Sequence, residues 1–323
     1  DTDRSRGLGD VYKRQLVQNY LQHQGVETLD YVIGTHPDAD HIGGMDVVLY
    51  KFDCKTIIMP DVANNTRTYD DVVQTMKNKG YKTTYPVVGE TYTIGGAAFT
   101  IIAPNKEYGN DMNSWSVGVL LQNGNHRFLF TGDAEEGAEQ DILQNGIDIS
   151  ADVYKVAHHG SNTATSQAFL DAVHPTYAVI SAGEGNSYGH PHAEVLNRLR
   201  AAGVSVFRTD EQGPIVATSD GTTLTWNMSP SESWQAGEAK KSQDTDKSEK
   251  STDSQNNAET DAAVSNPTDQ TDGNSDVIVH ITKTGEKYHS AGCQYLRKSD
   301  IEVTLSEAKA RGLTPCSKCN PPQ

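Results

Sequence analysis

The chain has 323 residues, of which 35% are hydrophobic and 22% are charged, and its formal net charge is -16. A mean hydropathy of -0.60 is low for one compact enzyme of this size, so we expect part of the chain to be unfolded. Apolar runs stay well short of the roughly 18 residues that a membrane-spanning helix needs, and the N-terminus has no apolar stretch of the signal-peptide type. We therefore expect no membrane span.

The charge is unevenly distributed. Residues 1–228 carry 16 Lys/Arg against 28 Asp/Glu, residues 229–276 carry 4 against 11, and residues 277–323 carry 7 against 4. An acidic body repels the phosphate backbone of nucleic acids, which excludes a generic polyanion binder. A nucleic-acid site would need a local feature that overcomes this field.

Residues 1–15 show no useful periodicity, and we expect a non-native or disordered leader there. Beyond it, helices and strands alternate. We expect helices at 16–24, 67–79, 134–144, 165–173 and 193–202, and strands at 29–34, 56–59, 98–102, 116–122, 126–131, 153–157, 177–181, 204–207, 214–218 and 222–227. This interleaving predicts an α/β domain over 16–228 with a largely buried sheet.

Residues 229–276 are rich in Ser, Thr, Asp, Gln and Asn, with almost no large apolar residue after Trp234. Such a segment buries too little surface to offset its ordering entropy, so we predict a disordered acidic linker. Residues 277–323 regain a strand at 277–281 and a helix at 305–312, which predicts a small second domain.

Four potential metal ligands follow the strand at 29–34 within six residues, namely His36, Asp38, Asp40 and His41. Carboxylates and imidazoles together suit Zn²⁺ or Mn²⁺, and several carboxylates in an open site suit a two-metal centre. Gly43 and Gly44 then let a helix begin close to the site. The alternative is an exposed polar turn with a helix-capping aspartate.

Three further polar clusters each follow a predicted strand: Asp133; His158, His159, Gly160 and Ser161; and His190. Taken alone, Asp133 is also typical of a turn or helix cap, and the histidine pair of a polar loop with a structural imidazole. His190 is a candidate ligand, acid or oxyanion-side donor. Because α/β enzymes build their sites from loops at strand ends, we expect all four clusters to converge.

In this order, the segments THPDADHIGG, FTGDA, VAHHGS and YGHPH resemble the metallo-β-lactamase superfamily, in particular its ComEC competence-protein branch. The resemblance covers about 16–228 and implies an αββα sandwich with two divalent ions, Zn²⁺ or Mn²⁺, at one sheet edge. The resemblance implies that the first metal-binding motif consists of His36, Asp38, Asp40 and His41. It implies that Asp133 is the carboxylate that bridges the two metal ions. It also implies that His158 or His159 is a later metal ligand and that His190 lies beside the metal ions.

This chain departs from the superfamily pattern at three places. Asp38 stands where many members have a second His, which makes the site harder and more tolerant of Mn²⁺. Asn113 and Ser114 stand where other branches carry a metal-binding His. The first strands of the family, with a DVGQGD-like segment, are not found, so we expect an N-terminally truncated domain.

The resemblance implies a phosphodiesterase, most concretely a DNA nuclease that uses a hydroxide held by two metal ions. Asp40 and His190 are the catalytic candidates, with His190 as proton donor to the leaving oxygen. The amides of Gly160 and Ser161 are expected to bind a phosphate oxygen. The acidic body leaves two alternatives open: a phosphodiesterase for a small phosphorylcholine- or nucleotide-type ester, and a non-catalytic metal-bound binding module.

The tail contains an HxxxC and a CxxC motif, with His289, Cys293, Cys316 and Cys319 as the four ligands of an expected tetrahedral Zn²⁺ site. The alternative is a disulfide between Cys316 and Cys319. The pattern resembles the Ada-type metal-binding domain, with His289 in place of its first Cys, which implies a structural zinc module without methyl transfer.

The long polar linker and the resemblance to secreted relatives favour an extracellular or cell-surface location.

Overall fold

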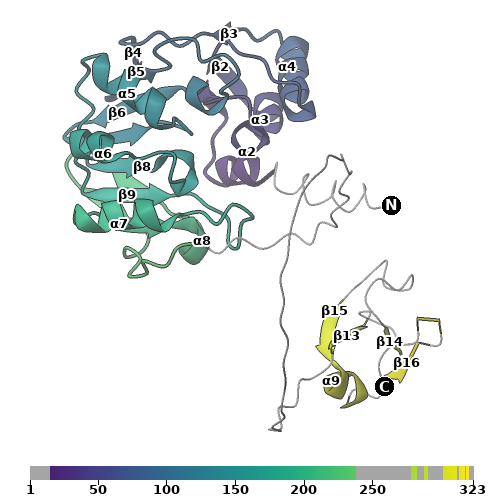
Figure 1. Ribbon diagram of the computed structural model, residues 1–323. Helices are drawn as coiled ribbons and strands as arrows, with labels where there is room; N and C mark the ends of the chain where they lie inside the picture. The colour runs from purple at the N-terminus through teal and green to yellow at the C-terminus, as the bar shows by residue number, and fades with distance from the viewer. Residues whose placement is uncertain are drawn as a thin grey trace, which may run out of the picture. The chain divides into compact units, whose positions relative to one another are not determined.

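The computed structural model describes residues 15–237, 278–281, 287–289, 301–310, 313–316, 318 and 319 (Figure 1). The chain divides into two compact units, Asp1–Asp246 and Lys247–Gln323. Within the described ranges, helices fall short of the length and apolar character needed to cross a bilayer.

Among the described residues, the larger sheet of the first unit has seven strands in the order β10-β9-β8-β7-β6-β5-β4. Their bounds are β4 Thr91–Ile94, β5 Ala97–Ala103, β6 Gly118–Asn123, β7 His126–Phe130, β8 Val153–Lys155, β9 Tyr177–Ile180 and β10 Ser205–Arg208. Strands β7 to β10 are parallel, whereas β4 to β7 pair antiparallel. The carboxyl ends of β7, β8 and β9 therefore lie at one edge.

The smaller sheet is parallel throughout and has the order β1-β2-β3, with β1 Thr28–Ile33, β2 Asp53–Ile58 and β3 Thr83–Thr84. Residues 15–23 form a helix before it. The helices between its strands are α2 Ala39–Ile42, α3 Met45–Lys51 and α4 Arg67–Lys79. Helix α4 begins where the Thr66 side chain accepts a hydrogen bond from the amide of Tyr69, and it ends at Gly80.

The two sheets pack face to face and each is covered by helices on its outer face (Figure 1). Between the sheets, Ile58 of β2 packs with Phe99, Ile101 and Val119 of the larger sheet. On the outer face of the smaller sheet lie α3 and α4. On the larger sheet lie α5 Glu136–Gln144, α6 Gln167–Val173 and α7 Ala193–Ala201. The predicted αββα sandwich is thereby confirmed.

The first unit closes with short elements and a strap. The elements are α8 Thr209–Gln212 and the hairpin of β11 Ala217–Ser219 and β12 Leu224–Trp226. Residues 229–237, expected to belong to the linker, instead pack on this unit and are called the strap below. Trp234 packs against the main core, Gln235 accepts a hydrogen bond from Arg208 at 2.6 Å, and the Gly237 amide donates to the Pro191 carbonyl at 2.9 Å. The partly buried indole and these two hydrogen bonds together attach this polar segment to the first unit.

The second unit is a small α+β module. Its sheet has the order β15-β13-β14-β16, with β13 Ile278–Ile281, β14 Lys287–His289, β15 Ile301–Thr304 and β16 Thr314–Pro315. Helix α9 Leu305–Ala310 contributes Ala308 to a core with Val279, Tyr288 and Val303. The predicted strand and helix of the tail both form.

Candidate metal centre

The four polar clusters of the first unit follow strands that end at one edge of the sandwich. His36 comes three residues after β1, and Asp133 comes three residues after β7. The histidine pair follows β8, and His190 lies in the long loop after β9. At this edge the two sheets are joined, because the Val117 amide donates a hydrogen bond to the Thr35 carbonyl at 2.7 Å. The chain therefore brings these loops together from both sheets.

Four of the predicted residues form one compact group, with possible ligand atoms that all lie within 4.8 Å of one another: Asp40, His41, Asp133 and His159. Asp133 Oδ2 is 3.1 Å from His41 Nε2 and 3.3 Å from His159 Nε2. His159 Nε2 is also 3.3 Å from Asp40 Oδ2. We call these four residues the quartet. Two carboxylates and two imidazoles converging on one point are a ligand set for a divalent ion.

A second position lies beside the quartet. The His36 ring is fully buried, its centroid is 4.0 Å from that of His41, and its Nε2 is 3.7 Å from Asp38 Oδ2. Within the part of the chain that the structure describes, His36 Nε2 and Asp133 Oδ1 are buried without a hydrogen-bond partner. Buried polar atoms are nearly always paired, so two unpartnered atoms beside a ligand cluster are suited to bind a cation. The residues present thus fit two divalent ions.

The structure separates the roles of the two adjacent histidines. The Nδ1 of His159 donates a hydrogen bond to the Ser181 carbonyl at 2.8 Å, which turns its Nε2 toward the quartet. His158 Nε2 is 3.9 Å from Asp133, and its Nδ1 is 3.1 Å from Thr163 Oγ1 and 3.2 Å from Glu135 Oε1. This geometry favours His159 as the ligand and leaves His158 beside it at the cleft.

His190 lies next to the quartet and is held by its own loop. Its ring centroid is 5.6 Å from that of His158 and 6.2 Å from that of His159. The His190 amide donates to Asn186 Oδ1 at 3.0 Å, and Asn186 Nδ2 donates to the His190 carbonyl at 2.7 Å. Burial, helped by the neighbouring His192, lowers the pKa of His190 to about 4, so the ring is neutral near pH 7.

Charges within the quartet are strongly coupled. Burial alone would raise the pKa of Asp133, but hydrogen bonds from His159 and His41 outweigh it and hold the pKa well below its usual range. The hydrogen bond from His159 lowers the pKa of Asp40 to about 2. In return, Asp133 and Asp40 raise the pKa of His159 to about 10. Without a metal, an imidazolium therefore sits between two carboxylates, where a cation would bind.

Burial also sets the state of His36. Loss of solvent, together with the nearby His41, lowers its pKa to about 4. The ring is thus neutral at physiological pH, which is the state that a metal ligand requires. Burial raises the pKa of Asp38, and an amide hydrogen bond from Asn64 to its Oδ1 at 2.8 Å opposes this.

Several supporting residues were missed by sequence reasoning. Ser116 Oγ accepts a hydrogen bond from the Asp133 amide at 2.9 Å and lies 3.1 Å from His36 Nδ1. Thr35 Oγ1 lies 3.1 Å from His41 Nδ1. Gly132, with a φ of +55°, allows this approach, because a Cβ there would come within 2.6 Å of Ser116 Oγ. Serine and threonine are too common for their spacing to indicate a metal site. The one available signal was that Ser116 is the first residue of the strand predicted at 116–122.

Two predicted phosphate-binding residues are not brought into the cleft. The Ser161 amide donates to the His158 carbonyl at 2.7 Å, and the Gly160 carbonyl accepts from the His192 amide at 2.9 Å. Both residues are buried and are not among the residues that line the cleft. The Ser161 N–H thus closes the turn after β8 in this structure, and the phosphate contact of Gly160 and Ser161 stays a prediction. Asn113, noted where other branches carry a His, does line the cleft, while Ser114 is buried.

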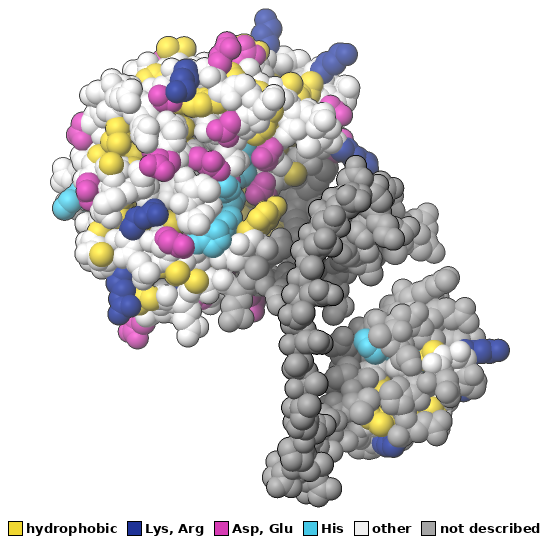
Figure 2. Space-filling model, viewed as in Figure 1, with side chains coloured by type: hydrophobic (Ala, Val, Ile, Leu, Met, Phe, Trp, Pro, Cys, Tyr) yellow, Lys and Arg dark blue, Asp and Glu magenta, His cyan; other side chains and the backbone are white. Residues whose placement is uncertain are grey.

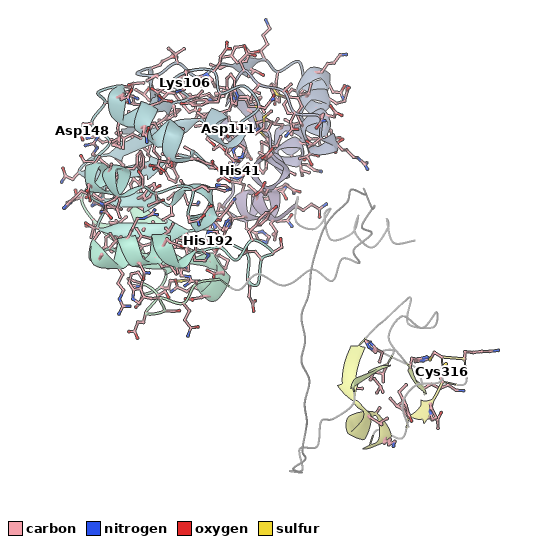
Figure 3. The ribbon with its side chains drawn as sticks, viewed as in Figure 1. His41, Lys106, Asp111, Asp148, His192 and Cys316 are labelled. Atoms are coloured by element: carbon pink, nitrogen blue, oxygen red, sulfur yellow. The ribbon has the colours of Figure 1, made fainter. Side chains whose placement is uncertain are left out.

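The cleft has a volume of about 590 Å³ and is lined by Asp40, Asp133 and His159 together with residues of the loop 181–190. Figure 2 shows the histidines gathered in a hollow of the first unit, with acidic side chains scattered around it. His41 and His192, both labelled in Figure 3, are connected through neighbouring rings, with centroid distances of 5.2 Å from His41 to His159, 6.2 Å from His159 to His190 and 4.8 Å from His190 to His192. The site is thus open to a ligand from solvent.

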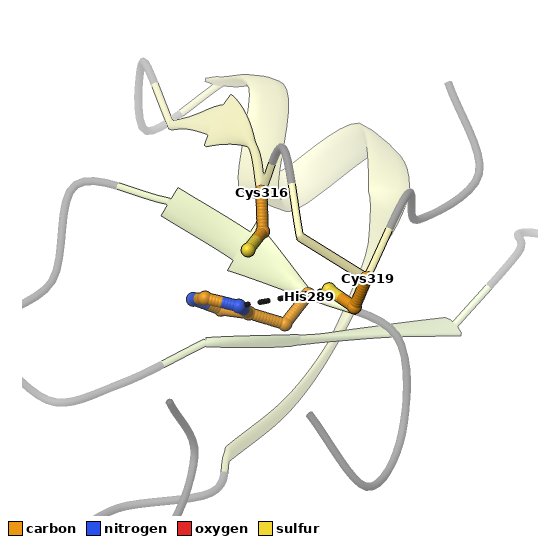
Figure 4. A group of neighbouring side chains, drawn as sticks. All are labelled: His289, Cys316 and Cys319. Atoms are coloured by element: carbon orange, nitrogen blue, oxygen red, sulfur yellow. Dashed lines mark hydrogen bonds between the residues drawn. The ribbon is translucent and has the colours of Figure 1, made fainter. Parts of the chain in front are cut away.

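The second unit contains a separate cluster of His289, Cys316 and Cys319, whose possible ligand atoms lie within 4.8 Å of one another. Cys319 Sγ is 3.8 Å from His289 Nδ1 (Figure 4). Pairing of β14 with β16 places the two segments side by side, and the Cys316 amide donates to the Tyr288 carbonyl at 2.9 Å. The described Cys316 and Cys319 are not joined by a disulfide. Cys293, the fourth predicted ligand, lies outside the described residues.

Known proteins are similar to part of this chain. ComE operon protein 3 of Bacillus subtilis (strain 168) is 32% identical over 196 residues, which is 61% of this chain and 25% of that protein. Recombination protein 2 of Haemophilus influenzae is 32% identical over 67% of this chain and 25% of its own length. Competence protein ComA of Neisseria gonorrhoeae is 30% identical over 60% of this chain and 26% of its own length. The chain thus spans about a quarter of the length of these relatives.

Among solved structures, CmlA, a diiron beta-hydroxylase from Streptomyces venezuelae, matches with a TM-score of 0.40 and 12% identity over 57% of this chain and 44% of its own. The metallo-beta-lactamase fold protein YhfI from Bacillus subtilis matches with a TM-score of 0.30 and 16% identity over 47% and 63% of the two chains. The family model described as "Metallo-beta-lactamase superfamily" matches residues 7–184, more than half of the sequence. The chain belongs to the metallo-β-lactamase superfamily.

Proposed function

We propose that this protein is a metal-dependent phosphodiesterase whose substrate is DNA. The observation that carries the proposal is the quartet with the orphaned Asp133 Oδ1 and His36 Nε2 beside it. Superfamily membership makes hydrolysis the expected reaction class. The relatives named as competence and recombination proteins support a nucleic-acid substrate.

The residues of the site divide into two ligand sets. The quartet would hold one divalent ion, and His36, Asp38 and Asp133 Oδ1 would hold the other. Such ions, when bound, polarise phosphoryl oxygens and lower the pKa of water. Ser181 and Thr35 contact the Nδ1 atoms of His159 and His41, which keeps both Nε2 atoms turned toward the site.

Two further histidines face the cleft without belonging to the quartet. His158 has Glu135 beside its Nδ1, so its Nε2 is the better placed to give a proton to the leaving oxygen. His190 is neutral near pH 7, and its ring N–H offers a hydrogen bond to a phosphoryl oxygen rather than a mobile proton. This assignment moves the predicted proton donor from His190 to His158.

A small phosphodiester remains a second candidate substrate. Residues 1–228 carry 16 Lys/Arg against 28 Asp/Glu, and such a surface repels a polyanion more than a singly charged ester.

The His/Cys cluster of the second unit does not distinguish between the two substrates. We propose that His289, Cys316 and Cys319, with Cys293, hold a structural Zn²⁺ that stabilises a module with a small core.

The function is tested with full-length protein stripped by chelator and reloaded with Mn²⁺ or Zn²⁺. We expect hydrolysis of a single-stranded DNA oligonucleotide and of bis(p-nitrophenyl) phosphate. We expect at least about a 100-fold loss in Asp40→Ala, because a direct ligand is worth more than the supporting contacts that cost 10–100-fold. Asp70→Ala, an exposed carboxylate on α4, should match the wild type.

Circular dichroism of each variant separates lost chemistry from lost folding. Absence of turnover with either metal and both substrates overturns the phosphodiesterase. If metal is nevertheless bound with high affinity, the non-catalytic binding module replaces it. Full activity in Asp40→Ala would remove the quartet from the mechanism.

A further inference from the structure

An exposed aromatic side chain stands at the wall of the cleft. Tyr188 is 75% exposed, more than any other large hydrophobic side chain that the structure describes, and it lines the same cleft as Asp40, Asp133 and His159. Single exposed apolar residues are ordinary on a surface. One that borders a metal site in a hollow is a candidate ligand contact.

The Tyr188 ring continues a series of stacked rings that begins at the quartet. The ring planes of His159 and His190 lie within 17° of each other, with centroids 6.2 Å apart. The ring planes of His190 and Tyr188 lie within 16°, with centroids 5.5 Å apart. His190 therefore backs Tyr188 on the side of the metal position, while most of the phenol ring stays open to solvent.

The loop holds Tyr188 in this orientation from both sides. Asn186 Oδ1 accepts a hydrogen bond from the Tyr188 amide at 3.2 Å and from the His190 amide at 3.0 Å. His192 Nε2 donates to the Tyr188 carbonyl at 3.1 Å. The backbone of Tyr188 is thus fixed although its ring is exposed, which is what a preorganised contact surface requires.

The charge around the site explains why such a surface is needed. Asp38, Asp40 and Asp133 line the cleft, and the surrounding domain is acidic. A phosphodiester gains little from this field beyond the bound cations, so affinity must come from an uncharged part of the substrate. A flat aromatic face binds a nucleobase by stacking, without reading its sequence.

We propose that Tyr188 is a stacking platform for a nucleobase attached to the scissile phosphodiester. The inference rests on the proposed phosphodiesterase function and narrows its substrate to nucleotide esters. A DNA strand and a small nucleotide diester share this chemistry. A phosphorylcholine ester does not, because its quaternary ammonium group is held by several aromatic walls rather than by one flat face.

The test compares two single-stranded probes of equal length and charge: oligo-dT and a fully abasic strand of tetrahydrofuran units. Binding is measured by fluorescence anisotropy on the metal-free full-length protein, and KM and kcat on the metal-loaded protein. We expect oligo-dT to bind about 5- to 100-fold more tightly than the abasic strand. Tyr188→Ala should abolish this preference through KM, with kcat little changed, and Tyr188→Phe should keep it.

Tyr50→Ala is the matched control, because Tyr50 is 64% exposed on α3 and lies outside the cleft lining. Equal binding of both strands by the wild type, or an unchanged preference in Tyr188→Ala, overturns the platform. Hydrolysis of both strands with equal KM leaves the phosphodiesterase standing and removes the platform alone. Tighter binding of oligo-dT than of the abasic strand, without hydrolysis of either, supports the platform and overturns the phosphodiesterase.

Two further substrates identify the source of the base. A dinucleotide and p-nitrophenylphosphorylcholine are compared with oligo-dT in the same assay. A KM increase in Tyr188→Ala for both the dinucleotide and oligo-dT supports a nucleobase contact. The ratio of the wild-type kcat/KM values for oligo-dT and the dinucleotide then shows whether a DNA strand or a small diester is the better substrate. An increase confined to the choline ester overturns the nucleobase proposal.

Discussion

The turn after β8 places two consecutive histidines in the left-handed region, with φ of 46° at His158 and 54° at His159. This conformation is uncommon for residues other than glycine and costs free energy that the surrounding contacts must offset. The Gly132 carbonyl accepts from the His158 amide at 3.2 Å, and the Ser161 amide closes the turn. The result is that neighbouring imidazoles face different partners, Asp133 for one and Glu135 for the other.

At this scale the sequence predicted which residues gather but not what each one does. His36, Asp40, His41 and Asp133 were found because imidazoles and carboxylates are recognisable ligands after a strand. His158 and His159 have the same chemistry and adjacent positions, so only the backbone conformation distinguishes them. The hydrogen bond of the Ser161 amide could not be predicted for a related reason, since it depends on that turn.

Replacing His159 with Gln should flatten the pH dependence of stability in the metal-free protein. Asp133 and Asp40 raise the pKa of His159 from 6.5 to about 10, so the folded state binds this proton more tightly than the unfolded chain. The stabilisation is fully present below pH 6.5 and is lost as the pH rises through 10.

Thermal unfolding in EDTA between pH 6.5 and 10 measures the effect. The Tm of the wild type should fall more over this range than that of His159→Gln. His23→Gln, an exposed histidine on the first helix, serves as the control and should follow the wild type. Parallel profiles for wild type and His159→Gln would contradict the ion pair.

Among the elements, those with strong local signals formed as predicted. The helix expected at 67–79 is α4, because Thr66 and Gly80 supply both ends. Strand β4 at Thr91–Ile94 was missed, although Gly95 and Gly96 between it and β5 are a hairpin signal. It is a short edge strand with mostly exposed side chains, so it lacks the apolar alternation that marks a strand.

Helix α5 is tied to the loop before α6 by a buried carboxylate. Glu139 is fully buried and accepts hydrogen bonds from the amides of Thr165 and Ser166. In Glu139→Gln an amide NH₂ would face a backbone donor, and one buried N–H would lose its acceptor. We expect the free energy of unfolding to fall by about 1–3 kcal/mol, a Tm decrease of roughly 2–4 °C per kcal/mol.

Calorimetry of the first unit's transition in the full-length protein measures this loss. Glu136→Gln, an exposed carboxylate on the same helix, removes the same charge and should leave the Tm unchanged. Equal Tm values for Glu139→Gln and the wild type would show that the loop is held by other contacts.

Over the whole molecule, hydrophobic periodicity indicated alternating helices and strands but not how two sheets would stack. The αββα arrangement came from the motif resemblance, because the contact of Ile58 with Phe99 and Val119 joins segments far apart in sequence. Composition did predict the acidic character of the surface, which no single element reveals.

That acidity should set the sign of the salt dependence. Proteins that neutralise DNA phosphates with basic residues lose affinity steeply between about 50 and 200 mM salt. Here added salt screens a repulsion, so kcat/KM for a single-stranded oligonucleotide should stay level or rise over that range. Bis(p-nitrophenyl) phosphate, with one charge, provides the reference. A steep fall for the oligonucleotide alone would reveal a basic binding surface.

The strap also determines where the first unit can be truncated. Composition suggests a boundary at residue 228. A chain that ended there would expose the part of the core against which Trp234 packs. The guanidinium of Arg208, which is 2% exposed, would also lose its hydrogen bond to the Gln235 carbonyl. The truncation would also free the Pro191 carbonyl next to His190. We therefore expect a fragment of the first unit to need its chain as far as residue 237, and a shorter one to lose solubility and the shape of the cleft wall together.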